Sequence, residues 1–275
     1  MSLARELLAR HALRPKKSWG QNFLGNAELA TRIAELATTP AGGTVVEIGA
    51  GLGALTGPLL GRAARVVAIE RDRDLVRVLR EEFASSLATG QLVLEEADAK
   101  AADYRALSAL GPRPHVVGGN LPYQLTGVLL ERITAVAEHL DRAVVLVQLE
   151  VADRMVAAAG TPSYGALSVF LQAQFEPRRA MLVRKGAFYP EPRVDSAVVV
   201  LEPRRPPIAR ETDAFRALVA AAFGQRRKQL KNAWREVVGP PELDSAAMRA
   251  GIDLGRRGET LGVAEFARMA REIER

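Results

Sequence analysis

The sequence lacks cysteine altogether, so the chain can form neither disulfide bonds nor thiolate metal sites. It contains only three histidines, and none stands in a pattern typical of a catalytic base or of a metal-ligand cluster. We therefore expect no metal ion, and the absence of cysteine fits a reducing compartment.

Long apolar runs are missing too. No segment reaches the ~20 apolar residues of a membrane span, and the N-terminus lacks the apolar core of a signal peptide. We therefore expect a soluble, cytoplasmic protein that does not bind membranes. Nothing indicates a dimer seam, so we expect a monomer. Hydrophobic residues still make up 48% of the 275 positions, which is sufficient for a packed core.

Charge is unevenly spread over the chain, whose formal net charge is +6. Residues 44–177 carry a net charge of −4, whereas residues 1–43 carry +3, residues 178–210 carry +5 and residues 211–275 carry +2. A polyanionic partner that contacts both ends of the chain would account for this segregation. Genome composition could account for the predominance of arginine over lysine, but not for where the charges lie.

Strands and helices are predicted to alternate through much of the chain. We predict strands, rich in β-branched residues, at Thr44–Ile48, Arg65–Ile69, Leu92–Leu94, His115–Gly118 and Ala143–Leu149. We predict helices at residues 3–14, 27–37 (with Asn26 as N-cap), 54–60, 72–88, 104–110, 127–137, 151–159 and 166–173. This alternation predicts βαβ units and an α/β fold with a doubly wound, mostly parallel sheet.

The last part of the chain follows a different pattern. Arg179–Val183 and Ala197–Leu201 read as strands without a crossover helix between them, which predicts an antiparallel pair at one edge of the sheet. Residues 202–207 are typical of a linker, and the rest of the chain contains only helical patterns. We therefore predict an α/β domain over residues 1–205 and a small all-helical domain over residues 206–275.

The sequence is organised around the stretch from Val116 to Tyr123, in a chain of which only 5% is aromatic. Pro122 biases Leu121 away from the helical conformation, so the Leu121 carbonyl is free to accept a hydrogen bond. Asn120 adds a side-chain oxygen as a second acceptor, and Tyr123 supplies a flat face. Two acceptors beside an aromatic plane suit a flat heterocycle with an exocyclic amino group. Taken alone, the stretch would also suit a strand followed by a proline turn with a buried tyrosine.

A glycine-rich turn follows the first predicted strand. Gly49 and Gly51 permit close backbone approach to a ligand, and Glu70 ends the second strand, where a carboxylate suits a ribose diol. The turn also fits the dinucleotide fingerprint, so a nicotinamide-dependent dehydrogenase is an alternative. Glu47 before the turn, Asp98 after the third strand and the Asn-Leu-Pro-Tyr stretch after the fourth favour S-adenosylmethionine instead. Because these residues follow consecutive parallel strands, we expect them to converge on one cleft.

In this order, the motifs resemble those of the ribosomal RNA adenine dimethyltransferases, which dimethylate two adjacent adenines in a hairpin loop near the 3′ end of small-subunit rRNA. The resemblance is carried by residues 17–24, 47–56, 69–70, 98, 120–123, 148–155, 164–168, 188–197 and 223–232. It implies a Rossmann-like class I methyltransferase domain in which residues 1–43 cover the cofactor, S-adenosylmethionine. It also implies small-subunit (16S) rRNA, in the 30S subunit or a precursor, as the partner and N6,N6-dimethyladenine as the product.

The resemblance further implies roles for individual residues. Those implied to bind the cofactor are Asn22, Leu24, Gly49, Gly51, Glu70, Asp98 and Asn120. Asn120 and Leu121 would accept hydrogen bonds from the target amine. Pro122 would hold their turn, and Tyr123 would stack on the target base. Phe188 would supply a second aromatic near the pocket, although packing of its loop would explain it equally well.

A basic segment in the predicted helical domain completes the pattern. The residues implied to contact RNA are Arg226, Arg227, Lys228, Lys231 and Arg235. Three of these cations recur at i, i+4 and i+8, beside an apolar stripe over residues 219–237 that approximates one helix face. A solvated basic face is the alternative interpretation, and the basic flanks of the chain favour phosphate contact.

The sequence departs from the family pattern at three places, and other functions compete with the one implied. Trp19 stands where an aliphatic residue or phenylalanine is commoner, residues 97–100 lack the usual neighbours of the acid, and Gln124 follows the tyrosine. The alternatives are a resistance-type methyltransferase of large-subunit (23S) rRNA, a DNA adenine methyltransferase, and a non-catalytic ribosome-assembly or transcription factor on the same fold. Pro190–Ala197 and the Phe-Gly-Gln-Arg-Arg-Lys match favour the small-subunit branch.

Overall fold

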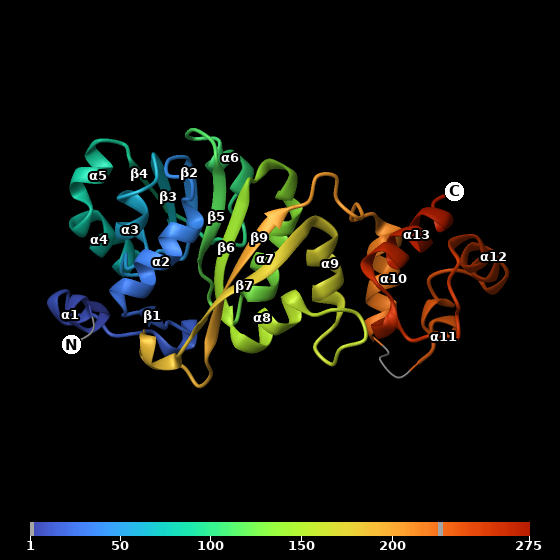
Figure 1. The fold of residues 1–275 in the computed structure, drawn as a ribbon. Helices are drawn as coiled ribbons and strands as arrows, with labels where there is room; N and C mark the ends of the chain where they lie inside the picture. Colours follow the sequence, from blue (N-terminus) through green and yellow to red (C-terminus); the bar gives the residue numbers. More distant parts are fainter. Residues whose placement is uncertain (1–2, 225–227) are drawn as a thin grey trace. The chain divides into compact units, whose positions relative to one another are not determined.

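The computed structural model describes residues 3–224 and 228–275, and its main sheet has seven strands (Figure 1). In spatial order they are β4 (Leu92–Glu96), β3 (Arg65–Glu70), β2 (Thr44–Ile48), β5 (His115–Asn120), β6 (Arg142–Gln148), β9 (Ser196–Pro203) and β7 (Phe175–Val183). Strands β4 to β6 run parallel, and β9 runs antiparallel to β6. The predicted doubly wound, mostly parallel sheet is confirmed, with the two late strands at one edge.

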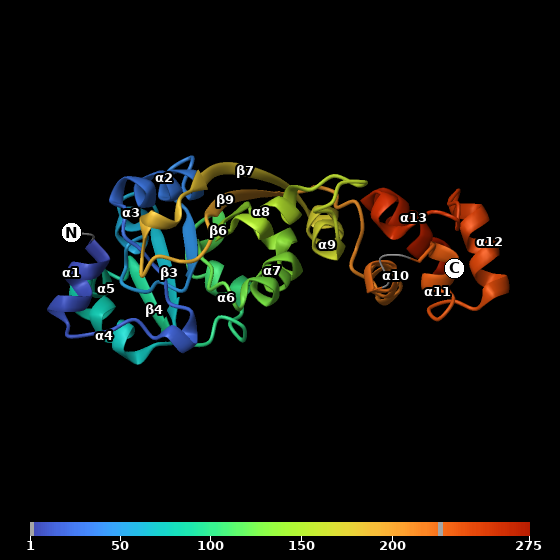
Figure 2. The same ribbon diagram turned by 90° about the horizontal axis from the view of Figure 1, so that it is seen from below.

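Eight helices accompany the described strands from the N-terminus to β6 and just beyond it. They are α1 (Leu3–Arg10), α2 (Ala27–Ala37), α3 (Thr56–Leu60), α4 (Arg73–Glu82), α5 (Ala84–Ala88), α6 (Tyr104–Ser108), α7 (Thr126–Ala135) and α8 (Leu149–Val156). Asn26 caps α2 as predicted, since its side chain accepts a hydrogen bond from the Leu29 N–H. Helices α2 and α3 lie on one side of the sheet, and α6 and α7 lie on the other (Figure 2).

The sheet is buried because helices cover both of its faces. Val45, Val66 and Val116 belong to the same apolar cluster as Ile33 of α2 and Leu59 of α3. Every residue of β2 is buried, and so are nearly all residues of β3 and β6. Burying one such aliphatic side chain stabilises the fold by roughly 1.5–3 kcal/mol. This burial explains why the strands appear in the sequence as continuous apolar runs.

Two predicted helices are interrupted where the sequence pattern runs on. The predicted helix over residues 72–88 divides at Phe83 into α4 and α5, because Phe83 takes φ −119° and ψ 27° while its ring packs against the glycine-rich turn after β2. The predicted helix over residues 3–14 ends at Arg10, and Ala12 adopts a left-handed φ of 52°. Helical periodicity continues through both breaks, so the sequence pattern did not reveal them.

A second, two-stranded sheet was not predicted. Strand β1 (Phe23–Leu24) pairs antiparallel with β8 (Phe188–Tyr189). Two-residue strands are too short to show an alternating pattern. The pairing fastens the N-terminal segment to the segment that precedes β9.

The chain folds into two compact units. The sheet unit consists of Met1–Ala152 and Arg178–Pro203, and the helical unit consists of Asp153–Pro177 and Arg204–Arg275. The boundary after Pro203 lies beside the one predicted at residue 205. Residues 153–177, in contrast, group with the C-terminal helices, because α9 (Ala166–Gln174) contributes Val169 and Ala173 to their apolar core.

The helical unit is built around large buried side chains. After α9 it contains α10 (Asp213–Gly224), α11 (Leu230–Trp234), α12 (Pro240–Ala250) and α13 (Val263–Ile273). Trp234 is fully buried, its Nε1 donates to the Leu218 carbonyl at 2.8 Å, and its ring lies edge-on to Phe266. The described residues confirm the predicted helical character. The stripe predicted over residues 219–237 is not one helix, because Gln229 takes an extended conformation between α10 and α11.

In the parts of the chain that the structure describes, no helix has both the length and the apolar character needed to cross a membrane.

Candidate active site

A cavity lies at the carboxyl ends of the parallel strands, where the strand order reverses between β2 and β5. Open α/β sheets bind ligands at this position, because the loops that leave neighbouring strands diverge there. The cavity is lined by residues 19–23, 48–49, 51, 69–71, 75, 97–99, 120–125 and 129. The predicted site residues among them are Asn22, Gly49, Gly51, Glu70, Asp98, Asn120, Leu121, Pro122 and Tyr123.

Backbone N–H groups hold the Glu70 carboxylate from two sides. Its Oε2 accepts a hydrogen bond from Gly51 at 2.9 Å, and its Oε1 accepts one from Asp72 at 2.8 Å. Gly51 has φ 61°, and a Cβ there would lie 3.3 Å from the Phe23 ring, so the turn requires glycine. Burial raises the pKa of Glu70 above its usual value, although the N–H groups oppose the rise. The carboxylate has about four acceptor sites, so it keeps capacity that a ribose hydroxyl could use.

Asp98 lies in the turn after β4. Its carboxylate accepts a hydrogen bond from the Lys100 N–H at 3.0 Å and lies 3.9 Å from Arg71 Nη1 and 3.4 Å from Lys100 Nζ. The Ala97 N–H donates to the Glu70 carbonyl at 3.2 Å, which ties this turn to the end of β3. The unusual neighbours of Asp98 in the sequence therefore do not remove its carboxylate from the cavity.

Asn120, the last residue of β5, and Leu121, which follows it, carry two available acceptors. Asn120 Nδ2 donates to the Asn22 carbonyl at 2.9 Å, and no described donor contacts Asn120 Oδ1. The Leu121 N–H donates to the Leu146 carbonyl at 3.1 Å, while the Leu121 carbonyl receives no hydrogen bond from the described residues. Gly119 has φ 141°, and a side chain there would approach the last carbonyl of β2 to 2.5 Å. Both predicted acceptors are thus present at the cavity.

The antiparallel strand β9 positions Tyr123. The Tyr123 Oη lies 2.8 Å from the Oγ of Ser196, the fully buried first residue of β9. Burial raises the pKa of Tyr123, so the phenol is neutral at physiological pH. Sequence reasoning missed Ser196, because 73 residues separate the two partners. Its place at the start of a strand inside a family motif was the only available signal.

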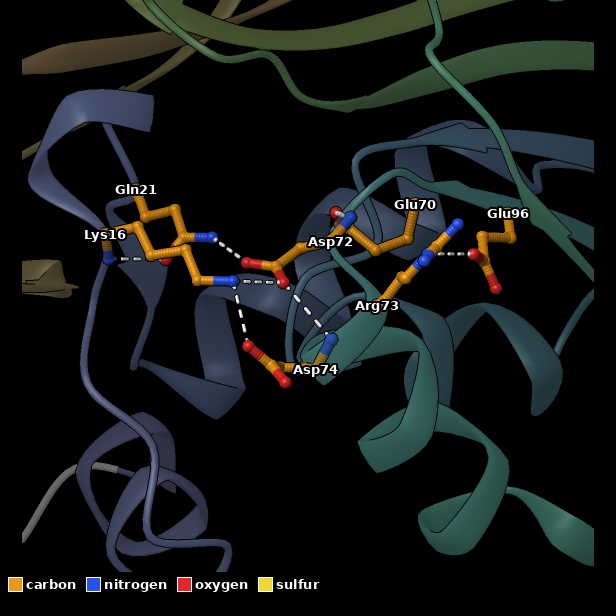
Figure 3. A network of polar contacts seen from close by, with 7 residues as sticks. All are labelled: Lys16, Gln21, Glu70, Asp72, Arg73, Asp74 and Glu96. Atoms are coloured by element: carbon orange, nitrogen blue, oxygen red, sulfur yellow. Dashed lines mark hydrogen bonds and ion pairs between the residues drawn. The ribbon is translucent and has the colours of Figure 1, made fainter.

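Polar contacts that converge on Asp72 hold the N-terminal segment beside the cavity (Figure 3). Lys16 Nζ donates to Asp72 Oδ1 at 2.6 Å and to Asp74 Oδ2 at 2.9 Å. Gln21 Nε2 donates to Asp72 Oδ2 at 2.9 Å, and the Lys16 N–H donates to Gln21 Oε1 at 2.8 Å. The hydrogen bond to Asp72, followed by the one to Asp74, raises the pKa of Lys16. Sequence analysis identified the segment but neither Lys16 nor Asp72.

Two predicted residues lie elsewhere in the sheet unit. Leu24 and Phe188 are 4% and 5% exposed, face each other across the β1–β8 pair, and belong to the apolar cluster that contains α2. Neither lines the cavity. Phe188 thus packs in this apolar cluster from strand β8, as the alternative of a packing role would have it.

The basic residues of the helical unit lie on its surface where the structure describes them. Lys228, Lys231 and Arg235 are exposed, and the last two are four residues apart at α11. Arg226 and Arg227 lie outside the described residues. The exposed cations are accessible to a polyanion.

A further carboxyl lies close to the glycine turn. Glu47 of β2 is 2% exposed, and its Oε2 accepts a hydrogen bond from Thr56 Oγ1 at 2.6 Å. Burial raises the pKa of Glu47 to about 8, so this carboxyl is mostly protonated at neutral pH. Within residues 3–224 and 228–275, no group of three or more histidines or carboxylates is arranged to hold a metal ion.

Comparisons with known proteins agree with this geometry. The family model for ribosomal RNA adenine dimethylase matches residues 12–275. Ribosomal RNA small subunit methyltransferase A of Anaeromyxobacter sp. (strain K) is 48% identical, over 98% of this chain and 97% of that protein. The protein of the same name from Myxococcus xanthus (strain DK1622) is 39% identical, over 99% of this chain and 96% of that protein.

Solved structures share the fold over most of the chain. The 23S rRNA methyltransferase ErmE matches with a TM-score of 0.69 at 25% identity. The match covers 92% of this chain and 100% of the ErmE chain. A dimethyladenosine transferase from Plasmodium falciparum has a TM-score of 0.72 at 22% identity and covers 90% of this chain and 95% of its own. At that identity the second likeness concerns the fold alone.

Proposed function

Because the chain belongs to the ribosomal RNA adenine dimethylase family, we propose that it transfers methyl groups to N6 of two adjacent adenines in the 3′-terminal hairpin loop of small-subunit rRNA. The methyl donor is S-adenosylmethionine, and the product is N6,N6-dimethyladenine. The substrate is the small ribosomal subunit or a precursor of it, on which the protein acts as a monomer in the cytoplasm. The observation that best supports this proposal is that two available acceptors and an aromatic ring, at residues 120–123, line the same cavity as Glu70 and Asp98.

The residues of the cavity fit S-adenosylmethionine. Glu70 would bind the ribose hydroxyls with the lone pairs that its backbone partners leave, and Asp98 would accept a hydrogen bond from the adenine amino group. Gly49 and Gly51 both adopt positive φ and allow the backbone to approach the ligand closely. When bound, the cofactor supplies a methyl group made electrophilic by its positively charged sulfur.

The acceptors at the end of β5 would activate the target amine. The lone pair of an adenine N6 is delocalised into the ring, so this nitrogen is a poor nucleophile. Asn120 Oδ1 and the Leu121 carbonyl would accept its two hydrogens and draw the nitrogen towards tetrahedral geometry, which localises the lone pair. Tyr123 would hold the base by stacking. A strong general base is unnecessary, because the methylated nitrogen is cationic and loses a proton readily.

The target base has to leave its stack to reach this cavity, since an adenine inside a helix is inaccessible. The remaining RNA then needs a docking surface of positive charge. Lys228, Lys231 and Arg235 of the helical unit are exposed and would contact phosphates.

Two alternatives make different predictions. A resistance-type enzyme would methylate large-subunit rRNA, and ErmE shares the fold; however, the small-subunit relatives are 48% and 39% identical against 25% for ErmE. A non-catalytic assembly factor would not need the two available acceptors of Asn120 and Leu121 beside Glu70 and Asp98.

The test is methyl transfer from labelled S-adenosylmethionine to unmethylated small subunits, with products resolved by mass spectrometry. We expect N6,N6-dimethyladenine in small-subunit RNA and no transfer to subunits that are already dimethylated, which serve as the control. Transfer to large-subunit RNA alone would identify the resistance-type activity. RNA binding without transfer to any RNA would identify the assembly factor.

A further inference from the structure

Three consecutive residues, the last of β3 and the two that follow it, contact either the glycine turn or the N-terminal segment. Glu70 holds the glycine turn through the Gly51 N–H. The Arg71 guanidinium lies 4.1 Å from the centre of the Trp19 ring, a cation–π contact. Asp72 receives hydrogen bonds from the N-terminal segment. The end of this strand therefore fastens the segment as well as shaping the cofactor site.

Asp72 is the most enclosed of these anchoring groups. Its side chain is only 3% exposed, and a carboxylate at such a position is costly unless partners satisfy it. It has three: Lys16 Nζ, Gln21 Nε2 and the Asp74 N–H, which it caps at the start of α4. Two of the three come from the N-terminal segment. Loss of that segment would leave the Asp72 charge largely uncompensated.

The segment is also tied to the groups proposed to bind cofactor and substrate. The Asp72 N–H donates to Glu70 Oε1 at 2.8 Å, and the Asn22 carbonyl accepts from Asn120 at 2.9 Å. Between these attachments, residues 19–23 line the cavity. The position of this part of the wall therefore depends on Asp72 at one end and on Asn120 at the other.

We propose that Lys16 and Asp72 are positioning residues that hold residues 16–22 against the cavity and thereby set the affinity for S-adenosylmethionine. Neither would contact the reacting atoms. The inference rests on the proposed function for its cofactor and adds the means by which the covering segment is secured.

Asp74 provides a matched comparison. It accepts from the same Lys16 Nζ, but its side chain is 45% exposed and it has no hydrogen bond to Gln21. Asp74→Asn therefore removes one carboxylate charge from Lys16 and leaves the link to the segment through Asp72 in place. Asp72→Asn keeps a good N-cap for α4. The amide N–H2 of the new asparagine would, however, face the N–H2 of Gln21, and two donors cannot form a hydrogen bond with each other.

The experiment measures the binding of S-adenosylmethionine and S-adenosylhomocysteine to the full chain by calorimetry, with the melting temperature of each free variant. We expect Asp72→Asn and Lys16→Met to weaken both ligands by about tenfold. We expect Asp74→Asn to stay within about twofold of the wild type. In methyl transfer, KM for the cofactor should rise in the first two variants, while kcat at saturation stays within a few fold.

A double variant separates positioning from general destabilisation. In Asp72→Asn combined with Gln21→Glu, the asparagine amide can donate to the new carboxylate, so cofactor affinity should recover towards the wild-type value. Equal affinities for the wild type, Lys16→Met and Asp72→Asn would overturn the inference, as would equal losses in Asp72→Asn and Asp74→Asn. Failure of the wild type itself to bind S-adenosylmethionine would instead contradict the proposed function.

Discussion

The sheet unit and the helical unit bury different kinds of side chain. The three buried carboxyl groups of the described residues, Glu47, Glu70 and Asp72, all belong to the sheet unit. The core of the helical unit is apolar and holds large aromatic rings such as Trp234 and Phe266. Burying a carboxyl costs free energy of folding, so a fold retains one where other requirements outweigh that cost.

The difference suggests a division of tasks between the units. At the cavity of the sheet unit, buried or partly buried acceptors hold backbone N–H groups and cations in place. Such preorganised groups are strong because water does not compete with them. We propose that the exposed cations of the helical unit would act in a different way, by attraction to phosphates, which requires no precise geometry. On this proposal, the sheet unit would carry the chemistry and the helical unit would supply much of the RNA affinity.

The largest expected effect is the loss of chemistry in Asn120→Ala. Removing one of the two acceptors should lower the single-turnover rate of methyl transfer by about 100- to 1,000-fold. RNA affinity, measured by filter binding, should stay within about twofold, because phosphate contacts carry most of it. Asn26→Ala serves as the control, since it removes the exposed N-cap of α2. Equal losses of rate in the two variants would contradict the assignment of Asn120.

A second set of substitutions should lower RNA affinity without changing cofactor binding. The triple variant Lys228→Ala, Lys231→Ala, Arg235→Ala should weaken RNA binding by about tenfold at moderate salt and make its salt dependence shallower by roughly two units of slope. Cofactor affinity, measured by calorimetry, should not change.

A charge-matched control for this variant lies in the same unit. Replacing Arg249, Arg268 and Arg275 by alanine removes three positive charges from α12, α13 and the segment after α13. If both triple variants weaken RNA binding equally, net charge alone governs affinity and the surface at α11 has no special role.

The smallest effect concerns stability and pH. The pKa of Glu47 is about 8 in the folded protein, against roughly 4.3 in an unfolded chain. Between these values the folded state binds a proton that the unfolded state has lost, so the free energy of unfolding falls as pH rises. Glu47→Gln keeps an acceptor for Thr56 and removes this titration. The melting temperature of Glu47→Gln minus that of the wild type should therefore increase by several degrees between pH 5 and pH 8.

The helical unit supplies a control of opposite sign. Burial by itself would raise the pKa of Glu265, but the hydrogen bond from Arg256 holds this pKa below its usual value. This group therefore contributes stability above its unfolded pKa, which is lost as pH falls through its folded pKa. Glu265→Gln should be less stable than the wild type at neutral pH, with the difference shrinking in acid. The same pH trend in both variants would contradict these assignments.

Much of the fold was predictable from the sequence, because strands covered on both faces need continuous β-branched apolar residues. The carboxyl ends of parallel strands lie at one edge, so the convergence of Gly51, Glu70, Asp98 and Asn120 followed from their order in the chain. The free carbonyl of Leu121 followed from the local effect of Pro122 on the residue before it, and the second acceptor followed from the side chain of Asn120. These are consequences of periodicity and local backbone geometry, which a sequence displays directly.

Only the tertiary structure decided which distant side chains meet. Lys16 and Asp72 are 56 residues apart, and Tyr123 and Ser196 are 73 apart. Likewise, Phe188 is buried in an apolar core where β1 pairs with β8, and it does not line the cavity. No local pattern records such partners, because a hydrogen bond between two segments depends on how the whole chain packs. The sequence by itself determined the strands and the chemistry at their ends; packing decided what holds that chemistry in place.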